Sequence, residues 1–141
     1  MTPPPDTYDG ALPRPTPETR PFWEGARDHR LMLPWCQDCG KPHFYPRAIC
    51  PFCLSDRLDW RQASGRGTLH TYVINHRPAK GFTAPYVIAV VDLAEGPRML
   101  SNVVTDGAPR PEDLRIDMAL EVVFDRVTAD ITLPRFRPVS A

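Results

Sequence analysis

Residues 36–53 read CQDCGKPHFYPRAICPFC, and this stretch decides how the chain is organised. Two residues between paired thiolates allow one tight turn to present both sulfurs to a single ion, and Gly40 supplies a permissive backbone after the first pair. The gap of ten residues between the pairs is shorter than the about 15–20 of the usual zinc pattern. The spacing C-x2-C-x10-C-x2-C predicts a zinc ribbon whose ligands are Cys36, Cys39, Cys50 and Cys53.

The predicted metal site has no position left for a reactant. Four thiolates fill a tetrahedron, so we expect the zinc to be structural and not catalytic. Two disulfides, a dithiol redox pair and a rubredoxin-like iron site remain as alternatives, although a reducing cytosol disfavours stable disulfides. His43 lies between the pairs and is a nominal competing ligand that four sulfurs make unnecessary. Leu54 follows the second pair where glycine would be easiest, so we expect strain or a different turn there.

Composition bounds the class of protein. The 141 residues suggest one domain or two very small ones. Lys+Arg and Asp+Glu balance at 17 each, which argues against a broad electrostatic surface for nucleic acid or an anionic membrane. The sequence shows no signal-peptide pattern and no apolar run approaching the ~18 residues of a membrane span, so we expect a cytoplasmic protein.

A proline-rich segment and a short helix precede the cysteines. Seven of the 18 prolines lie at or before position 21, in a stretch with few large apolar residues. We therefore expect residues 1–20 to form a disordered tail and residues 21–30 to form a helix that Thr19 caps. Phe22 and Trp23 would share one face of this helix, which docks either on its own domain or on a partner protein.

Short extended runs separated by turn residues follow the helix. In the ribbon, residues 31–64, the expected strands are 31–35, 44–45 and 58–61. The remaining region, residues 65–138, carries most of the β-branched residues. Five strands with a short helix between the third and fourth give the element order of an OB-fold barrel. The expected elements are strands 68–75, 86–93 and 98–104, a helical turn at 109–114, and strands 120–127 and 131–136.

The chain carries no recognisable catalytic constellation. All four cysteines are assigned to the metal, and the G-x-S-x-G, G-x-G-x-x-G, P-loop and H-E-x-x-H motifs are absent from the sequence. His70 and His76 would share a face of a regular strand and could form an acid–base pair, but a structural role is the expected one. The residues thus predict a binding or scaffolding component with no catalytic residues.

A series of motifs occurs in a fixed order from about Pro21 to Pro138. The order is Pro-Phe-Trp-Glu-Gly, Cys-x-x-Cys-Gly, Tyr45-Pro46-Arg47, Cys-Pro-x-Cys, Trp60, Ser64-Gly65-x-Gly67, Pro85-Tyr86-Val87, Val91-Asp92-Leu93-x-Glu95-Gly96-Pro97 and Phe136. This order resembles domain-of-unknown-function family thirty-five. The resemblance implies a mostly β fold with an N-terminal helix, a small rubredoxin-like zinc ribbon and a five-stranded OB-fold barrel. The sequence departs from the family at Leu54 and at Asp117, where members commonly have glycine.

Family members generally accompany acyl-CoA enzymes, above all thiolase-like and lipid-transfer-protein-like ones. The resemblance therefore implies a non-catalytic accessory subunit that binds and stabilises a thiolase-fold acyl-CoA enzyme, a thiolase or a lipid-transfer-type aldolase, and helps form its acyl-CoA channel. Some members serve steroid side-chain degradation. One alternative is an accessory domain of a hot-dog-fold enoyl-CoA hydratase. Alternatives of other classes are a single-stranded nucleic-acid module, which the neutral charge disfavours, and a free-standing acyl-CoA hydrolase, which lacks a nucleophile.

Two sets of contacts are expected from that function. Arg77, Lys80 and Arg98 are candidate CoA-binding residues, because cations at the mouth of a CoA tunnel can pair with its phosphates; the alternative is that they are solvated loop charges. Phe22 and Trp23 are candidate partner-binding residues, because aromatic side chains dominate protein interfaces.

Overall fold

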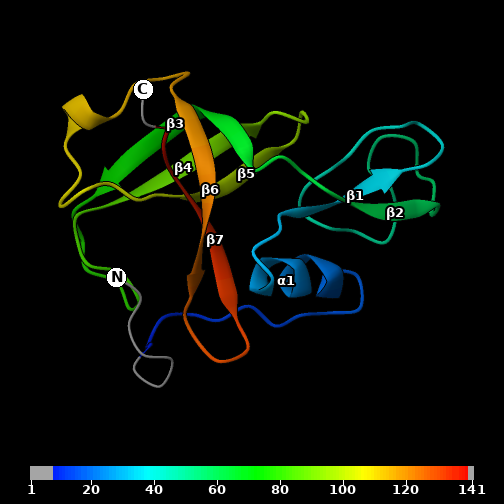
Figure 1. Cartoon of the computed structure of the whole chain (residues 1–141), viewed down its shortest axis with the longest axis horizontal. Coiled ribbons are helices and arrows are strands. Elements are labelled where there is room, and N and C mark those ends of the chain that lie inside the picture. The colour runs from blue at the N-terminus through cyan, green and yellow to red at the C-terminus, as the bar shows by residue number, and fades with distance from the viewer. Residues whose placement is uncertain (1–7, 140–141) are drawn as a thin grey trace.

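The structure is a computed structural model that describes residues 8–139, and it confirms the expected mostly β fold. One helix, a two-stranded ribbon and a closed barrel follow one another along the chain (Figure 1). In chain order the elements are α1 (Arg20–Arg27), β1 (Met32–Cys36), β2 (Leu58–Gln62), β3 (Arg66–Asn75), β4 (Tyr86–Leu93), β5 (Arg98–Val103), the short 3-10 helix η2 (Pro111–Asp113), β6 (Ala119–Arg126) and β7 (Thr132–Pro138).

The barrel has the strand order β3-β4-β5-β7-β6, with η2 between its third and fourth strands as an OB-fold requires. β4 shows why these residues form strands, since every second side chain is buried and the alternate ones are half-buried. The buried set is Val87, Ala89, Val91 and Leu93. One continuous core joins these side chains to Phe22 of α1 and Leu33 of β1, so helix, ribbon and barrel pack as one body.

β5 and β7 close the barrel through a short parallel contact. Within the described residues their ladder consists of Val103 opposite Phe136. The Val104 N–H donates to the Phe136 carbonyl at 2.7 Å, and the Ser101 hydroxyl donates to the Pro134 carbonyl at 3.0 Å. Pro134 has no N–H to extend the ladder. Among the neighbouring strands of the barrel, β5 and β7 therefore have the fewest paired residues, and this weakly paired junction lies next to α1.

The ribbon contains two of the three expected strands. β1 pairs with β2 in antiparallel register from Met32 opposite Gln62 to Cys36 opposite Leu58. The expected strand at 44–45 is wrong, because Phe44 and Tyr45 lie in a bend. Prolines 42 and 46 flank that bend and cannot donate to a ladder, and the two rings instead pack near Phe22.

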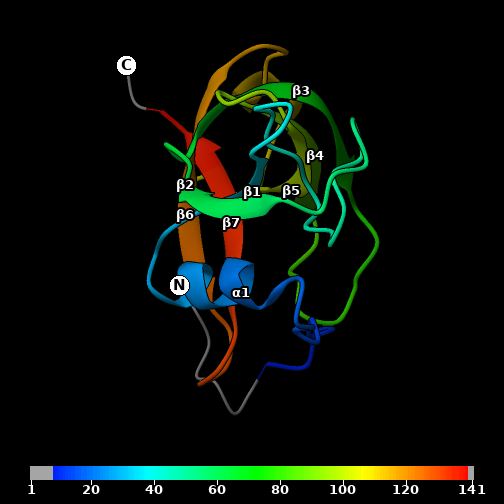
Figure 2. The ribbon, with the colours of Figure 1, turned by 90° about the vertical axis from the view of Figure 1, so that its right-hand side faces the viewer.

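α1 docks on its own chain through Phe22, Gly25 and Ala26, which are buried. Gly25 is needed there because a Cβ would lie 2.4 Å from the Met32 side chain. The helix ends in a Schellman motif, in which the Arg30 N–H donates to the Gly25 carbonyl at 2.8 Å and His29 takes a left-handed φ of 60°. Figure 2 shows α1 beside the strands β6 and β7.

The expected shared face of His70 and His76 is not found. The register of β3 against β4 shifts between Leu69 and Thr71, so the strand is bulged at His70, and His76 lies beyond its end. The His70 Nδ1 atom instead lies 3.2 Å from the Asp92 carboxylate.

Residues 8–18 form neither helix nor strand. The Asp9 carboxylate accepts the Gly81 N–H at 3.0 Å, and a Cβ on Gly81 would lie 2.8 Å from the Gly10 Cα. Residues 1–7 lie outside the described part, so the expectation of a disordered tail over 1–20 stays a prediction. No helix in the described part is long and apolar enough to cross a membrane.

Candidate metal centre and adjoining cavities

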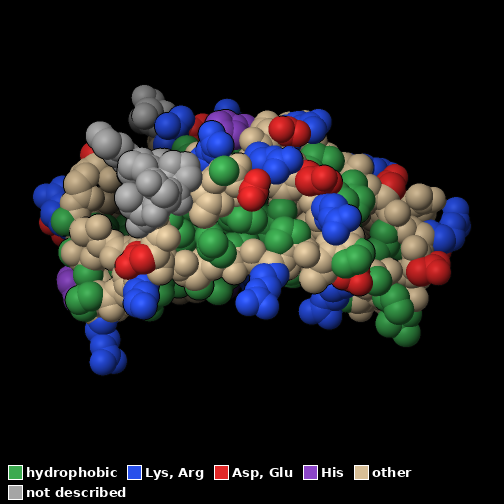
Figure 3. All heavy atoms as spheres, turned by 90° about the horizontal axis from the view of Figure 1, so that it is seen from below, with side chains coloured by type: hydrophobic (Ala, Val, Ile, Leu, Met, Phe, Trp, Pro, Cys, Tyr) green, Lys and Arg blue, Asp and Glu red, His purple; other side chains and the backbone are tan. Residues whose placement is uncertain are grey.

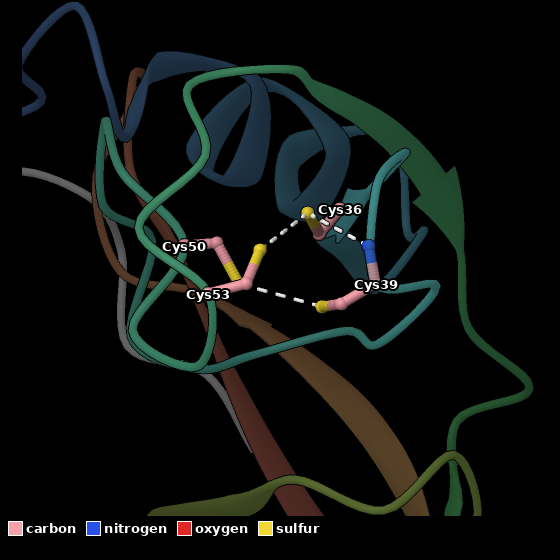
Figure 4. Close-up of side chains that lie close together, drawn as sticks. All are labelled: Cys36, Cys39, Cys50 and Cys53. Atoms are coloured by element: carbon pink, nitrogen blue, oxygen red, sulfur yellow. Dashed lines mark hydrogen bonds between the residues drawn. The ribbon is translucent and has the colours of Figure 1, made fainter.

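Two turns bring the four cysteines together. Cys36 ends β1 and Cys39 follows in the next turn, while Cys50 and Cys53 come from the second turn, with their sulfurs directed at the first pair (Figure 4). All four Sγ atoms lie within 4.8 Å of one another. The Cys36–Cys53 and Cys39–Cys50 Sγ distances are 3.5 and 3.7 Å. These are far longer than a disulfide bond of about 2.05 Å and close to the ~3.8 Å edge of a tetrahedron with 2.3 Å zinc–sulfur bonds. The four side chains fit a structural zinc ion.

The two turns share one backbone design. The Gly40 N–H donates to the Cys36 carbonyl, and the Leu54 N–H donates to the Cys50 carbonyl, both at 2.9 Å. Each donor follows the second cysteine of its pair and has a left-handed φ, 75° for Gly40 and 65° for Leu54. A side chain is strained in this region. The expected strain at Leu54 is therefore present, and Asp117 also adopts a left-handed φ, of 67°.

The pKa values of the Cys36 and Cys53 thiols differ because their surroundings differ. The Cys39 N–H points at the Cys36 sulfur at 3.5 Å and lowers the pKa of Cys36 to about 6. The Ser55 amide lowers the pKa of Cys53, but the Cys36 sulfur and burial outweigh it and raise that pKa to about 12. One ligand is thus readily deprotonated at neutral pH, whereas Cys53 loses its proton when a metal ion replaces it.

A polar network ties the two turns together outside the sulfurs. The Asp38 carboxylate, from the first turn, accepts hydrogen bonds from the Ser55 hydroxyl and the Arg57 guanidinium, both at 2.5 Å. The Arg57 carbonyl in turn accepts the Gln37 N–H at 2.8 Å. The turns are therefore held near each other by bonds that do not involve the metal.

An apolar cavity of about 400 Å³ lies at the weakly paired junction of β5 and β7. Trp23 and Tyr45 form one side, joined by a 3.1 Å hydrogen bond from the indole N–H to the phenol oxygen. Leu100 on β5 leaves 67% of its surface exposed at this cavity. Seen from below, hydrophobic side chains form a band on the surface between charged groups (Figure 3). The lining residues are Phe22, Trp23, Phe44, Tyr45, Met99, Leu100, Ser101, Asn102, Leu133, Pro134 and Arg135.

A second cavity, of about 490 Å³, lies between the ribbon and the β4–β5 turn. Arg47 and Arg98 contribute cations to it, and Phe44 lines both cavities. His43 also lines it, is only 3% exposed, and has no hydrogen bond of good geometry on either ring nitrogen within the described residues. Burial lowers the pKa of His43, and the Arg47 guanidinium lowers it further, so the imidazole is neutral at pH 7.

The structure does not bring the three predicted CoA-binding residues together. Arg77 and Lys80 are exposed in the loop before β4, whereas Arg98 begins β5, opposite Asp92 near the other end of β4. The strand from Tyr86, where that loop ends, to Asp92, which faces Arg98, is six residues or about 20 Å long. The Arg98 guanidinium pairs with Asp92 at 2.8 Å.

The two predicted partner contacts are also placed differently. Phe22 is 1% exposed and serves the core of its own chain, while Trp23 is half-buried at the rim of the apolar cavity. Sequence reasoning missed Arg47 and Arg135. Arg135 is buried 3.0 Å from the Asp125 carboxylate, with its guanidinium above the Phe82 ring. The signal for Arg135 was a cation within the expected strand 131–136, whereas Arg47 lies outside the strands and offered no such signal.

Comparison with known proteins matches both parts of the chain. Residues 23–59 match the family of the ChsH2 rubredoxin-like zinc ribbon domain, and residues 60–125 match that of the ChsH2 C-terminal OB-fold domain. A DUF35 domain-containing scaffold protein of Pyrococcus furiosus is 34% identical over 127 residues, which are 84% of this chain and 90% of the relative. A probable enoyl-CoA hydratase alpha subunit of Thermomonospora curvata is 37% identical over 121 residues, 83% of this chain, but the chain spans only 36% of that protein.

A solved structure agrees with these matches. A chain of an Ltp2–ChsH2(DUF35) aldolase superposes with a TM-score of 0.80 at 31% identity, covering 90% of this chain and 98% of that chain. The likeness extends over ribbon and barrel together. The chain therefore belongs to the DUF35 family, whose ChsH2-type members combine a rubredoxin-like zinc ribbon with an OB-fold barrel.

Proposed function

We propose that this chain is a non-catalytic accessory subunit that binds and stabilises a thiolase-fold acyl-CoA enzyme of the lipid-transfer aldolase type, and that it helps form the acyl-CoA channel. The observation that carries the proposal is the likeness to a chain of the Ltp2–ChsH2(DUF35) aldolase over 98% of that chain. A likeness over the full length covers the helix, the ribbon and the barrel together, which a match to one module would not.

The two cavities support a role in lining a channel. The apolar cavity beside Leu100 suits the uncharged arm and acyl part of a CoA thioester, and the cavity beside Arg47 and Arg98 suits its phosphates. Phe44 lines both cavities, so one extended ligand can occupy the two in sequence. A CoA thioester has phosphates at one end and an uncharged arm and acyl part at the other. Its channel therefore needs cations at one end and apolar surface further in.

This layout favours Arg98 over Arg77 and Lys80 as a CoA contact. Two double variants of the assembled complex test it: Arg47→Ala with Arg98→Ala, and, as a control of equal charge loss, Arg77→Ala with Lys80→Ala. The first should raise the KM for the CoA thioester severalfold, and less at high salt, because exposed charges are screened. If the KM rose only in Arg77→Ala with Lys80→Ala, the CoA phosphates would instead lie near the loop at the other end of β4.

The accessory role is tested by isolating the native complex. Wild-type chain should retain an acyl-CoA enzyme from its own cell extract, and mass spectrometry should identify that enzyme as thiolase-fold. The purified complex should break a carbon–carbon bond of a β-hydroxyacyl-CoA, giving a carbonyl product and a shorter acyl-CoA with its thioester intact. Steroid side-chain aldol adducts are among the substrates assayed, and the chain alone should show no turnover. Robust turnover by the isolated chain would overturn the proposal.

A second candidate is an accessory role with an enoyl-CoA hydratase. The 37% identity to a hydratase alpha subunit favours it, although the chain spans about a third of that protein. The same capture experiment separates the two, because it would then retain a hot-dog-fold subunit whose complex hydrates enoyl-CoA. Salt-dependent retention on single-stranded DNA without any captured enzyme would instead support nucleic-acid binding.

A further inference from the structure

The second zinc turn exposes three large apolar side chains. Ile49, Phe52 and Leu54 are 50%, 59% and 77% exposed. Phe52 and Leu54 belong to one tight loop, which the Cys50 N–H closes by donating to the Ser55 carbonyl at 2.8 Å, and Ile49 directly precedes that loop. Single exposed apolar residues are common on protein surfaces, but three on one short loop form an apolar projection. We call Ile49, Phe52 and Leu54 the knuckle tip.

Leu54 is held in a conformation that suits glycine. Its φ of 65° matches the 75° of Gly40 at the same position of the first turn, where glycine removes the strain. The hydrogen bond that each residue donates is also the same, so the metal site needs the left-handed backbone but not the leucine. With 77% of its surface exposed, the Leu54 side chain has little packing within the chain to offset the strain. Neither folding nor metal binding therefore accounts for this side chain, and strain of this kind points to function.

One cation, Lys41, lies beside Phe52 of the knuckle tip and has no ion-pair partner among the described residues. Lys41, from the first turn, places its ammonium 5.1 Å from the centre of the Phe52 ring. Among the described residues no carboxylate lies within ion-pair distance of Lys41, whereas the nearby Asp38 is already bonded to Ser55 and Arg57. A complementary surface would be apolar at its centre and would carry a carboxylate at its rim.

We propose that the knuckle tip is a docking surface, and that Leu54 inserts into an apolar socket, rimmed by a carboxylate facing Lys41, on the acyl-CoA enzyme subunit. The inference rests on the proposed function and adds a contact by Leu54, which lines neither cavity of the proposed channel, whereas Phe52 of the same tip also borders the cavity beside Arg47 and Arg98. A protein fits better than an anionic membrane, because the chain is neutral, with 17 charges of each sign. The inserted leucine accounts for the strain, since its binding energy is realised only in the complex.

The test uses Leu54→Gly and Leu54→Asn, since both residues tolerate a left-handed φ and both remove the apolar side chain. Zinc-loaded variants should keep about one zinc per chain and melt about 2–5 °C above the wild type. Their Kd for the purified enzyme subunit that the wild type retains should rise at least tenfold, as for other interface anchors. A leucine with a purely structural role would not change stability and affinity in opposite directions. Ile116→Asn, at a 56% exposed residue in the turn before β6, is the matched control and should change neither.

Several results would overturn the inference. An unchanged Kd in the Leu54 variants would do so, and so would a lowered melting temperature in both of them. An equal loss of affinity in Ile116→Asn would also do so. So would Leu54-dependent binding to phosphatidylcholine–phosphatidylserine vesicles, which assigns the tip to a membrane, or a Leu54-dependent dimer of the chain in sedimentation. If the wild type retains no acyl-CoA enzyme, the proposed function falls as well. If it does, and the Leu54 variants bind normally, only the docking surface is wrong.

Discussion

Replacement of Phe22 by alanine tests how helix, ribbon and barrel are joined. The ring is fully enclosed, with its centre 4.8 Å from Trp23, 5.5 Å from Phe44 and 6.0 Å from Tyr45. Removing a buried phenylalanine costs about 3–5 kcal/mol of unfolding free energy. Aromatic pairs add about 0.5–1.5 kcal/mol beyond area burial, so we expect the upper part of that range. For a domain of typical stability, about 5–15 kcal/mol, this is a large share.

Urea unfolding of the zinc-loaded chain, followed by tryptophan fluorescence and circular dichroism, measures the loss. Phe22→Ala should lower the midpoint with an unchanged slope and reduce the melting temperature by about 10 °C or more. The control is Trp23→Ala, half-buried on the same helix, which should cost only about 1–2 kcal/mol of stability but weaken enzyme capture. A loss below about 1 kcal/mol for Phe22→Ala, or a larger loss for Trp23→Ala, would refute the assignment of Phe22 to the core and Trp23 to the interface.

Three further predictions concern the metal, the N-terminal segment and pH. Metal analysis should find about one zinc per chain. Cys36→Ser or Cys50→Ser should lose both the zinc and the fold, because structural zinc supplies ~10 kcal/mol or more of binding free energy in small domains. A folded sample without zinc would contradict this. Limited proteolysis should trim residues 1–20 to a core near Pro21, since residues 8–18 form neither helix nor strand, and protection of the whole segment would be the opposite result. Because burial lowers the pKa of His43 in the folded state, the unfolded state takes up a proton first as the pH falls below 6.5. The stability should therefore decrease in that direction, and His43→Gln should flatten the dependence; equal pH slopes would argue against a buried neutral imidazole.

Local patterns in the sequence were sufficient for most of the elements. The cysteine spacing defines the two metal turns, because each pair is held by one turn of backbone and its own amide bonds. The strand boundaries follow from a side-chain period of two, and the prediction for β4 at 86–93 matches the structure residue for residue. The strain at Leu54 could also be predicted, since a turn of this kind needs a left-handed residue wherever it occurs.

The contacts between segments far apart in the sequence were decided by the tertiary structure alone. Phe44 and Tyr45 have the β propensity of a strand, and although the flanking Pro42 and Pro46 already disfavour a ladder, it is the tertiary structure that packs the two rings near Phe22. Arg77 and Arg98 look like one set of cations until pairing along β4 separates them by its length. The two cavities depend on contacts between residues far apart in the chain, and such contacts follow from burial of the shared core rather than from any local spacing. The sequence thus determines the zinc turns and the strands, whereas the surfaces available to a ligand or a partner exist only once the barrel has closed against the ribbon.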